Sequence, residues 1–203
     1  MSFPIRARVW LLSAAAVVAL SACQTTPEPA PIQAAPAAYS GPVLPIEQSD
    51  RGVQIFLPSS VLFEVGKASL DNAAADPYLD RVAHLLKTKT DKTVVLEGHA
   101  DSTGTDAINT ALSLQRAQTV SKALAERGVT TQRLSAAGFS SRRPVASNAT
   151  DAGRRLNRRV EVVVLDEKVE NITRGEPANA FASAWTQLKT LIEQGQVQPV
   201  GKE

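Results

Sequence analysis

The middle of the chain carries two repeating patterns of apolar residues. Apolar and polar residues alternate along a half-buried strand, whereas apolar residues recur every three or four positions along an amphipathic helix. These patterns predict strands at residues 53–57, 93–98, 133–137 and 158–165, and helices that end near residue 87 and run from about 106 to 127. The order strand-helix-strand-helix-strand-strand is typical of an α/β two-layer sandwich. We therefore expect a mixed four-stranded sheet with helices on one face (βαβαββ).

Residue types at the ends of the predicted helices agree with this assignment. Asp106 is a residue type that caps free backbone N–H groups where a helix begins. Gly128 most easily takes the left-handed turn that ends one. Pro77 is compatible with the first predicted helix only near its beginning, because proline removes a backbone donor.

The loop and helix that follow the strand at 93–98 carry the candidate chemistry. Asp101 lies in this loop, at one rim of the sheet, and Asn109, Ser113 and Arg116 share one face of the helix because their spacings are four and three. An acid in the loop and a base on the facing helix would form a small pocket with two opposite charges. Such a pocket suits a zwitterion, with its ammonium on Asp101 and its carboxylate on the planar fork of Arg116.

Alternation along the last strand separates two neighbouring arginines. Arg158 falls on the same, helix-covered side as Val160, which makes it a candidate for a second cation at the pocket. Arg159 and Glu161 point to the other face, together with Glu97 of the neighbouring strand, so Arg159 is expected in a surface ion pair. The assignment of Arg158 and Arg159 to opposite faces depends on the alternation alone, and a β-bulge would reverse it.

The first residues have the pattern of a targeting segment. Within residues 1–22, two arginines precede an apolar run at 10–20 that is too short to span a membrane as a mature helix. Small residues stand directly before Cys23, the only cysteine in the chain. This resembles the bacterial lipobox, in which the cysteine is acylated and the chain is cut before it; the alternative is an ordinary signal peptide. Gln24 follows where, by analogy with bacterial lipoproteins, Asp would favour the inner membrane, so we expect the outer membrane.

Two further segments flank the predicted domain. Residues 23–50 comprise the lipidated cysteine and a Pro/Ala-rich stretch, which cannot bury enough apolar surface to fold and is expected to be a tether. The domain itself is expected at 51–166. Within the extension 167–203, residues 179–193 have the spacing of an amphipathic helix that includes Trp185. This helix either packs back on the domain or docks a protein partner.

Composition narrows the classes of function. The net charge of +2 and the 4% of aromatic residues argue against a nucleic-acid-binding surface. His99 and His84, the only histidines, lack ligand spacing, so we expect no metal site and a hydrogen-bonded structural role for His99. Serine and threonine near the pocket loop lack a base and an orienting third group, so no nucleophile and no cofactor are expected.

Several motifs in the right order resemble the OmpA-like C-terminal, peptidoglycan-binding family, as found in Pal-like outer-membrane lipoproteins. The resemblance covers residues 61–165 and rests on these segments: Val-Leu-Phe-Glu at 61–64, Gly-His-Ala-Asp at 98–101, Asn109, Leu-Ser-x-x-Arg-Ala at 112–117, Ala-Gly-Phe at 137–139, Arg-Pro-Val at 143–145, and Gly-Arg-Arg-Leu-Asn-Arg-Arg-Val-Glu at 153–161. The chain has Glu64 where family members commonly have Asp, Ala100 where they have Thr, and Ser140 where they have Gly.

The resemblance implies a ligand and roles for named residues. Asp101 and Arg116 would clamp the diaminopimelate side chain of the cell-wall stem peptide, and the segment that contains Phe63 and Glu64 would add backbone contacts. With Asn109 and Arg158 from the pattern analysis, these residues make up the expected peptidoglycan site.

The expected function is therefore non-catalytic. A lipoprotein of the outer membrane, its domain facing the periplasm, would tether that membrane to diaminopimelate-type peptidoglycan. The alternative is an envelope signalling or assembly adaptor that uses wall binding as input and the C-terminal helix to contact a protein partner. A wall hydrolase is disfavoured because cleavage would need paired carboxylates or a metal site.

Overall fold

The structure is a computed structural model that describes residues 39–64 and 66–201. The predicted signal peptide, Cys23 and most of the predicted tether lie outside the described residues. Within the part that is described, no helix has both the length and the apolar character needed to cross a bilayer.

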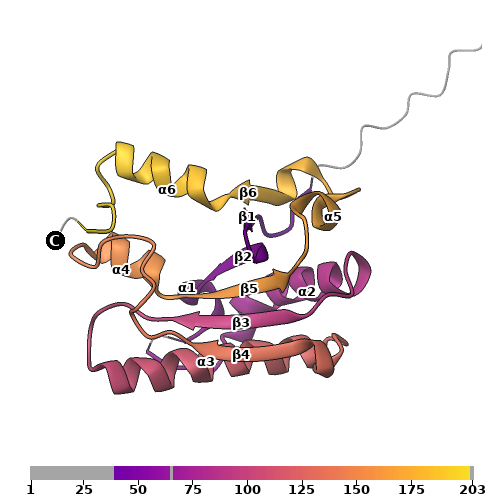
Figure 1. Ribbon diagram of the computed structural model, residues 1–203, viewed down its shortest axis with the longest axis horizontal. Coiled ribbons are helices and arrows are strands. Elements are labelled where there is room, and N and C mark those ends of the chain that lie inside the picture. The colour runs from indigo at the N-terminus through magenta and orange to yellow at the C-terminus, as the bar shows by residue number, and fades with distance from the viewer. Residues whose placement is uncertain (1–38, 65, 202–203) are drawn as a thin grey trace, which may run out of the picture. The chain divides into compact units, whose positions relative to one another are not determined.

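A mixed sheet of six strands forms the framework of the described region (Figure 1). Its strands are β1 (Leu44–Ser49), β2 (Gly52–Pro58), β3 (Val94–His99), β4 (Leu134–Gly138), β5 (Arg159–Leu165) and β6 (Phe181–Ser183). The spatial order is β4-β3-β5-β2-β1-β6. β3 pairs with β4 in parallel and β1 with β6 in parallel, while β1–β2, β2–β5 and β3–β5 are antiparallel.

Two long helices cover one face of this sheet. The helices are α1 (Ser59–Leu62), α2 (Asn72–Thr88), α3 (Asp106–Glu126), α4 (Asp151–Asn157), α5 (Val169–Thr173) and α6 (Ala184–Glu193), with 3₁₀ turns at Thr131–Arg133 and Ala178–Ala180. The core lies between the sheet and the two long helices, α2 and α3. Its buried side chains include Ile55, Leu79, Val120, Leu124 and Val162.

The ends of α3 show how local sequence fixes the helix beside the pocket. Thr105 caps its beginning by accepting a hydrogen bond from the backbone N–H of Ile108 at 3.3 Å, so the cap lies one residue before the predicted Asp106. Gly128 has φ +87° just after the helix, as its residue type predicts. The helix therefore begins immediately after the loop that carries Asp101.

The predicted fold class is confirmed, but the sheet has six strands among the described residues instead of four. Residues 44–49, which the sequence analysis assigned to the tether, form β1, and Leu44 and Ile46 are buried in the core. β6 has three residues and pairs with β1, for example through Leu44 and Phe181. The compact region therefore begins before the expected boundary at residue 51 and continues beyond residue 166.

The C-terminal extension packs back on the domain. The guanidinium of Arg81 on α2 lies over the rings of Tyr39 and Phe181, 5.2 and 5.6 Å from their centroids. Glu176 pairs with Arg81 and with Lys89, each at 2.7 Å. The expected helix at 179–193 is shorter than predicted, because Phe181 belongs to β6 and α6 begins only at residue 184.

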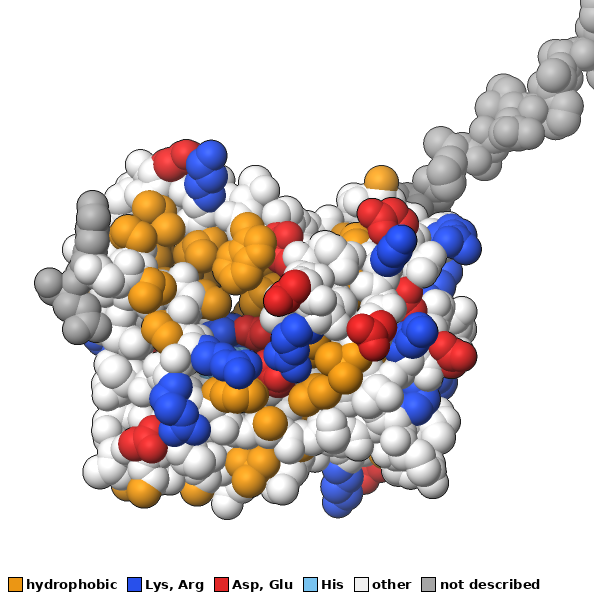
Figure 2. All heavy atoms as spheres, in the orientation of Figure 1, with side chains coloured by type: hydrophobic (Ala, Val, Ile, Leu, Met, Phe, Trp, Pro, Cys, Tyr) orange, Lys and Arg blue, Asp and Glu red, His pale blue; other side chains and the backbone are white. Residues whose placement is uncertain are grey.

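α6 itself is loosely packed. None of its residues is buried, and Trp185 is 43% exposed although its ring meets Phe56 edge-on at 5.3 Å. Figure 2, in the orientation of Figure 1, shows apolar side chains at the surface in the region of α6. The extension is thus held firmly near residue 176 and lightly along α6.

Candidate functional site

A pocket of about 470 Å³ opens where β3 meets α3. It is lined by all six residues that the sequence analysis placed in the ligand site: Phe63, Glu64, Asp101, Asn109, Arg116 and Arg158. These residues come from the segment after α1, the loop after β3, the first half of α3 and the residue before β5. The structure therefore brings together what the motifs place far apart in the sequence.

Close contact between β3 and α3 sets the width of this pocket. A Cβ atom at Gly98 would lie 1.9 Å from the carbonyl oxygen of Ser113, so only glycine allows the strand to approach the helix backbone this closely. Ser113 is one turn before Arg116, and Gly98 is three residues before Asp101. The contact therefore fixes the helical base opposite the loop acid.

Asp101 is buried and is held by its own loop. Its Oδ1 accepts hydrogen bonds from the backbone N–H of Thr103, at 2.9 Å, and from the Thr103 hydroxyl. Its Oδ2 accepts a hydrogen bond from Arg158. Burial by itself raises the pKa of Asp101, but the hydrogen bonds from Thr103 and Arg158 outweigh it and hold the pKa below its usual range.

Asn109 fixes the loop from the helix side. Its Nδ2 donates to the carbonyl oxygens of Asp101, at 3.1 Å, and Thr103, at 2.8 Å. Asn109 therefore supports the loop acid through hydrogen bonds to the loop backbone. Thr103 was not among the predicted site residues, although the local Asx-turn pattern, in which an aspartate accepts from the N–H two residues later, predicts such a contact.

Arg116 is only 4% exposed, yet no carboxylate among the described residues forms an ion pair with it. Its Nε donates to the carbonyl oxygen of Lys67 at 3.0 Å, and its guanidinium lies over the Phe63 ring at 5.2 Å. Burial lowers the pKa of Arg116, repulsion from Arg158 lowers it further, and Asp101 opposes both.

Among the described lining residues, the buried guanidinium of Arg116 is therefore not paired with the buried carboxylate of Asp101, which pairs with the half-buried Arg158 instead. Of the lining residues that the structure describes, Arg116 and Arg158 supply two guanidiniums, and Asp101 supplies the one buried carboxylate. Glu64 lies at the rim, where it pairs with Lys67 and is exposed to solvent. A buried cation without an acid is costly unless a ligand supplies one, so the arrangement fits a ligand that carries a carboxylate.

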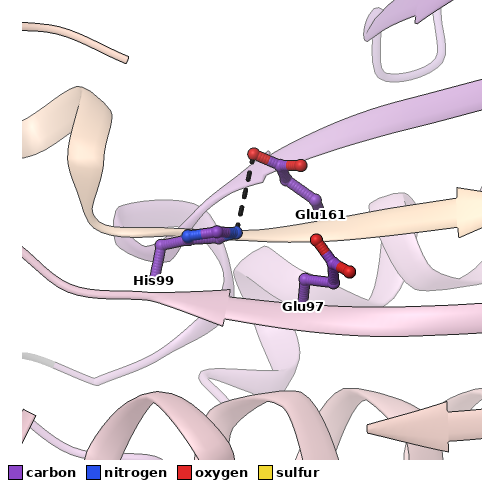
Figure 3. A group of neighbouring side chains, drawn as sticks. All are labelled: Glu97, His99 and Glu161. Atoms are coloured by element: carbon purple, nitrogen blue, oxygen red, sulfur yellow. Dashed lines mark ion pairs between the residues drawn. The ribbon is translucent and has the colours of Figure 1, made fainter. Parts of the chain in front are cut away.

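A second group of charged residues lies on β3 and β5. Figure 3 shows the side chains of Glu97, His99 and Glu161 lying close to one another beside these strands. Arg159, expected in a surface pair, is instead buried at 5% exposure, and its Nε and Nη2 lie 2.7 and 2.6 Å from Glu161 Oε1. The prediction that Arg159 lies at the surface is wrong. Its place on the same sheet face as Glu161 was expected from the alternation.

His99 differs from its expected role as well. It is buried, and neither ring nitrogen has a hydrogen-bond partner among the described residues. Its ring stacks on Phe139, with centroids 5.5 Å apart, and Nε2 is 3.6 Å from Glu161 Oε1. Burial, followed by repulsion from Arg159 and Arg143, lowers the pKa of His99 to about 2, so the imidazole is neutral near pH 7.

The ligand-type atoms of Glu97, His99 and Glu161 lie within 4.8 Å of one another, a spacing that could hold a metal ion. Protein groups already bind the carboxylates, however. Glu97 pairs with Arg51 at 2.8 Å and Arg143 at 3.3 Å, and Glu161 pairs with Arg159. A divalent cation would have to displace two guanidiniums and bind beside a third, so electrostatic repulsion disfavours it.

Comparison with known proteins gives the same assignment as the motifs. The model of the OmpA family matches residues 62–158. The chain is 48% identical over 86 residues to the peptidoglycan-binding protein ArfA of Mycobacterium tuberculosis, an alignment that covers 42% of this chain and 26% of ArfA. It is 36% identical over 119 residues to the probable lipoprotein YiaD of Escherichia coli, covering 59% of this chain and 54% of YiaD.

A solved structure extends the similarity to the fold. The cell wall anchor of the T6SS from Pseudomonas aeruginosa is 32% identical and aligns with a TM-score of 0.55, covering 60% of this chain and 87% of the anchor. The chain spans 26% of ArfA and 54% of YiaD, so it shares only part of the length of these curated relatives.

Proposed function

Because the chain belongs to the OmpA family, we propose that it binds peptidoglycan through the pocket between Asp101 and Arg116, without catalysing a reaction. The observation that carries this proposal is the buried guanidinium of Arg116, which has no carboxylate partner among the described residues and lines the same pocket as a buried acid. The names of the relatives support the same ligand class, since ArfA is a peptidoglycan-binding protein and the T6SS protein is a cell wall anchor.

The proposed contact is with the diaminopimelate side chain of the stem peptide. This side chain carries an ammonium and a carboxylate on one carbon. The ammonium would bind Asp101 Oδ2, because Oδ1 already accepts two hydrogen bonds from Thr103. The carboxylate would bind the terminal nitrogens of Arg116, whose Nε is held by Lys67 and whose guanidinium lies over Phe63.

Arg158 has to share or release its acceptor when the ligand binds. It donates to Asp101 Oδ2 and its side chain is 38% exposed, so it can move toward solvent. A ligand ammonium would then take the place of the Arg158 guanidinium at Asp101 Oδ2. Each charged hydrogen bond to the ligand contributes about 1.5–3 kcal/mol.

The setting we propose is the outer membrane, with the domain facing the periplasm. Acylation of Cys23 would anchor the chain, and the residues after it would let the domain reach the wall. The similarity to the probable lipoprotein YiaD supports the lipid anchor. Such a molecule would tether the membrane to the wall by binding alone.

The test is calorimetric titration of the full chain with the soluble tripeptide L-Ala–γ-D-Glu–diaminopimelate. We expect binding to this peptide and a loss of more than about tenfold when the side-chain carboxylate of diaminopimelate is amidated or when lysine replaces diaminopimelate, because Arg116 then stays unpaired. Equal affinity for the lysine peptide would contradict the proposal.

A matched pair of variants tests the acid. Asp101→Asn removes the buried charge and should lower the affinity more than about tenfold. Asp106→Asn is the control, because Asp106 is exposed and pairs with Arg142 outside the pocket. The control should bind the tripeptide as the parent chain does. An Asp101→Asn variant that binds equally well would contradict the proposed contact.

A further inference from the structure

We propose that the end of the C-terminal extension positions the ligand-binding loop, through a chain of hydrogen bonds that runs from Gln198 to Ser102. This inference rests on the proposed function of the pocket. The segment at residues 145–149, called here the bracing loop, lies between the extension and the pocket. The extension lies outside residues 62–158, which match the family model, so the coupling would be a property of this chain's own C-terminus.

The first step joins the extension to the bracing loop. The chain after α6 lies beside α4 (Figure 1), and the backbone N–H of Ser147 donates to the carbonyl oxygen of Gln198 at 2.9 Å. Val197, the residue before Gln198, is buried, and Ala146 and Ser147 of the bracing loop are buried as well. The backbone hydrogen bond therefore joins two buried segments, although α6 itself is loosely packed.

The second step joins the bracing loop to the pocket. Asn148 Oδ1 accepts a hydrogen bond from the backbone N–H of Ser102 at 3.2 Å. Ser102 directly follows Asp101, whose carboxylate accepts from the next N–H, that of Thr103. The tight turn that orients Asp101 is therefore held at two places. Asn148 binds the N–H of Ser102, and the Asp101 carboxylate itself binds the N–H of Thr103.

The bracing loop has a second support on α4. Asn157 Nδ2 donates to Asn148 Oδ1 at 2.9 Å and to the carbonyl oxygen of Ala146 at 2.8 Å. A Cβ atom at Gly153 would lie 1.9 Å from the carbonyl oxygen of Ser147, so α4 touches the loop backbone. The loop is thus clamped between α4 and the extension, and a change in either support moves Asn148 and, with it, the turn at Asp101.

The decisive experiment releases the extension in the full chain with Val197→Asp, because a charge cannot remain in that buried position. We expect the affinity for the diaminopimelate tripeptide to fall about three- to tenfold and the ¹H–¹⁵N signal of Ser102 to shift. Asn148→Ala should cause a similar loss, and the double variant should lose little more, because the extension acts on Ser102 only through Asn148. Val197→Ser is the milder alternative if Val197→Asp does not fold.

Glu176→Gln is the matched control within the same extension. It weakens the ion pairs with Arg81 and Lys89, which lie far along the extension from Gln198. It should leave the affinity within about twofold of the parent value and the Ser102 signal in place.

The outcomes separate this inference from the proposed function. Unchanged affinity and an unmoved Ser102 signal in Val197→Asp would overturn the coupling, as would fully additive losses in the double variant. If the parent chain does not bind the tripeptide, the proposed function fails, whereas the Ser102 signal still decides the coupling.

Discussion

Two groups of charged residues lie close together in this fold and differ in how their charges are matched. In the cluster of Glu97, Glu161 and Arg159, protein groups bind the buried carboxylates from several sides. In the pocket, Arg116 is as little exposed to solvent as Arg159, but among the described residues its guanidinium meets a backbone carbonyl and a ring and pairs with no acid. The cluster is internally paired, whereas the pocket has one buried carboxylate for two guanidiniums in the part of the chain described.

This difference indicates what each group does. In a buried ion pair whose partners are both present, each charge compensates the other, and removing one partner leaves an uncompensated charge. A buried cation without a carboxylate carries a desolvation cost that a ligand can relieve on binding. Charge alone would not distinguish the two groups, but the pairing does.

The largest effect is expected from Arg159→Met. The substitution leaves Glu161 buried without its guanidinium partner, so the free energy of unfolding should fall by about 3–5 kcal/mol. Urea unfolding measures this loss. Affinity for the tripeptide, corrected for the folded fraction, should stay close to that of the parent chain. A stability loss under about 1 kcal/mol would show that the cluster is not a buried ion pair of this kind.

The same substitution in the pocket, Arg116→Met, should act in the opposite sense. It removes a buried cation that pairs with no acid of the described residues, so stability should stay unchanged or rise, while affinity for the tripeptide falls about ten- to hundredfold. Urea unfolding and calorimetry on the two methionine variants test the comparison directly. If Arg116→Met unfolds as readily as Arg159→Met, the distinction between the two groups is wrong.

Much of this arrangement could be predicted from the sequence, because the relevant patterns are local. The spacing of Asn109, Ser113 and Arg116 places them on one helix face, and alternation places Arg158 and Arg159 on opposite sides. The structure brings Arg158 to Asp101 and Arg159 to Glu161, as that alternation implies.

The errors have a common cause, which is contact between segments far apart in the chain. β1 was missed because prolines surround its alternating residues, and β6 because three residues carry no pattern; the two strands pair across more than a hundred residues. Arg159 was expected at the surface because alternation identifies a face but does not tell what covers it. Burial of that face depends on the loop that carries Arg143 and on the extension, neither of which a periodicity describes.

Lowering the pH should reduce stability through His99 in the cluster and leave the ligand affinity of the pocket unchanged. In the unfolded chain His99 binds a proton near its ordinary pKa of 6.5, but in the folded chain its pKa is about 2, so the folded state excludes that proton. Above about pH 6.5 the buried, neutral His99 therefore does not lower the free energy of unfolding. Below it, the free energy of unfolding falls by up to about 1.4 kcal/mol for each pH unit.

Urea unfolding at pH 7, 6 and 5, compared between the parent chain and His99→Gln, isolates this effect because all other titrating groups are shared. The parent should lose more stability than the variant over this range. The pocket should keep its affinity meanwhile, since the pKa of Asp101 lies below its usual range and the acid stays ionised. Parallel pH curves for the two chains would contradict the assignment of a neutral buried His99.

The smallest effect is expected where the two groups are most alike, since each places an arginine over a phenylalanine ring. Arg116 lies over Phe63 at 5.2 Å in the pocket, and Arg143 over Phe139 at 3.8 Å beside the cluster. Phe63→Leu removes the ring that orients the ligand-binding guanidinium, and a cation–π contact of about 0.5–1 kcal/mol corresponds to about a two- to fivefold loss of tripeptide affinity. Phe139→Leu makes the same change beside a guanidinium whose partner is Glu97, so calorimetry should show no loss. Equal losses in both variants would mean that the rings act through general packing, and Phe63 would then have no part in orienting Arg116.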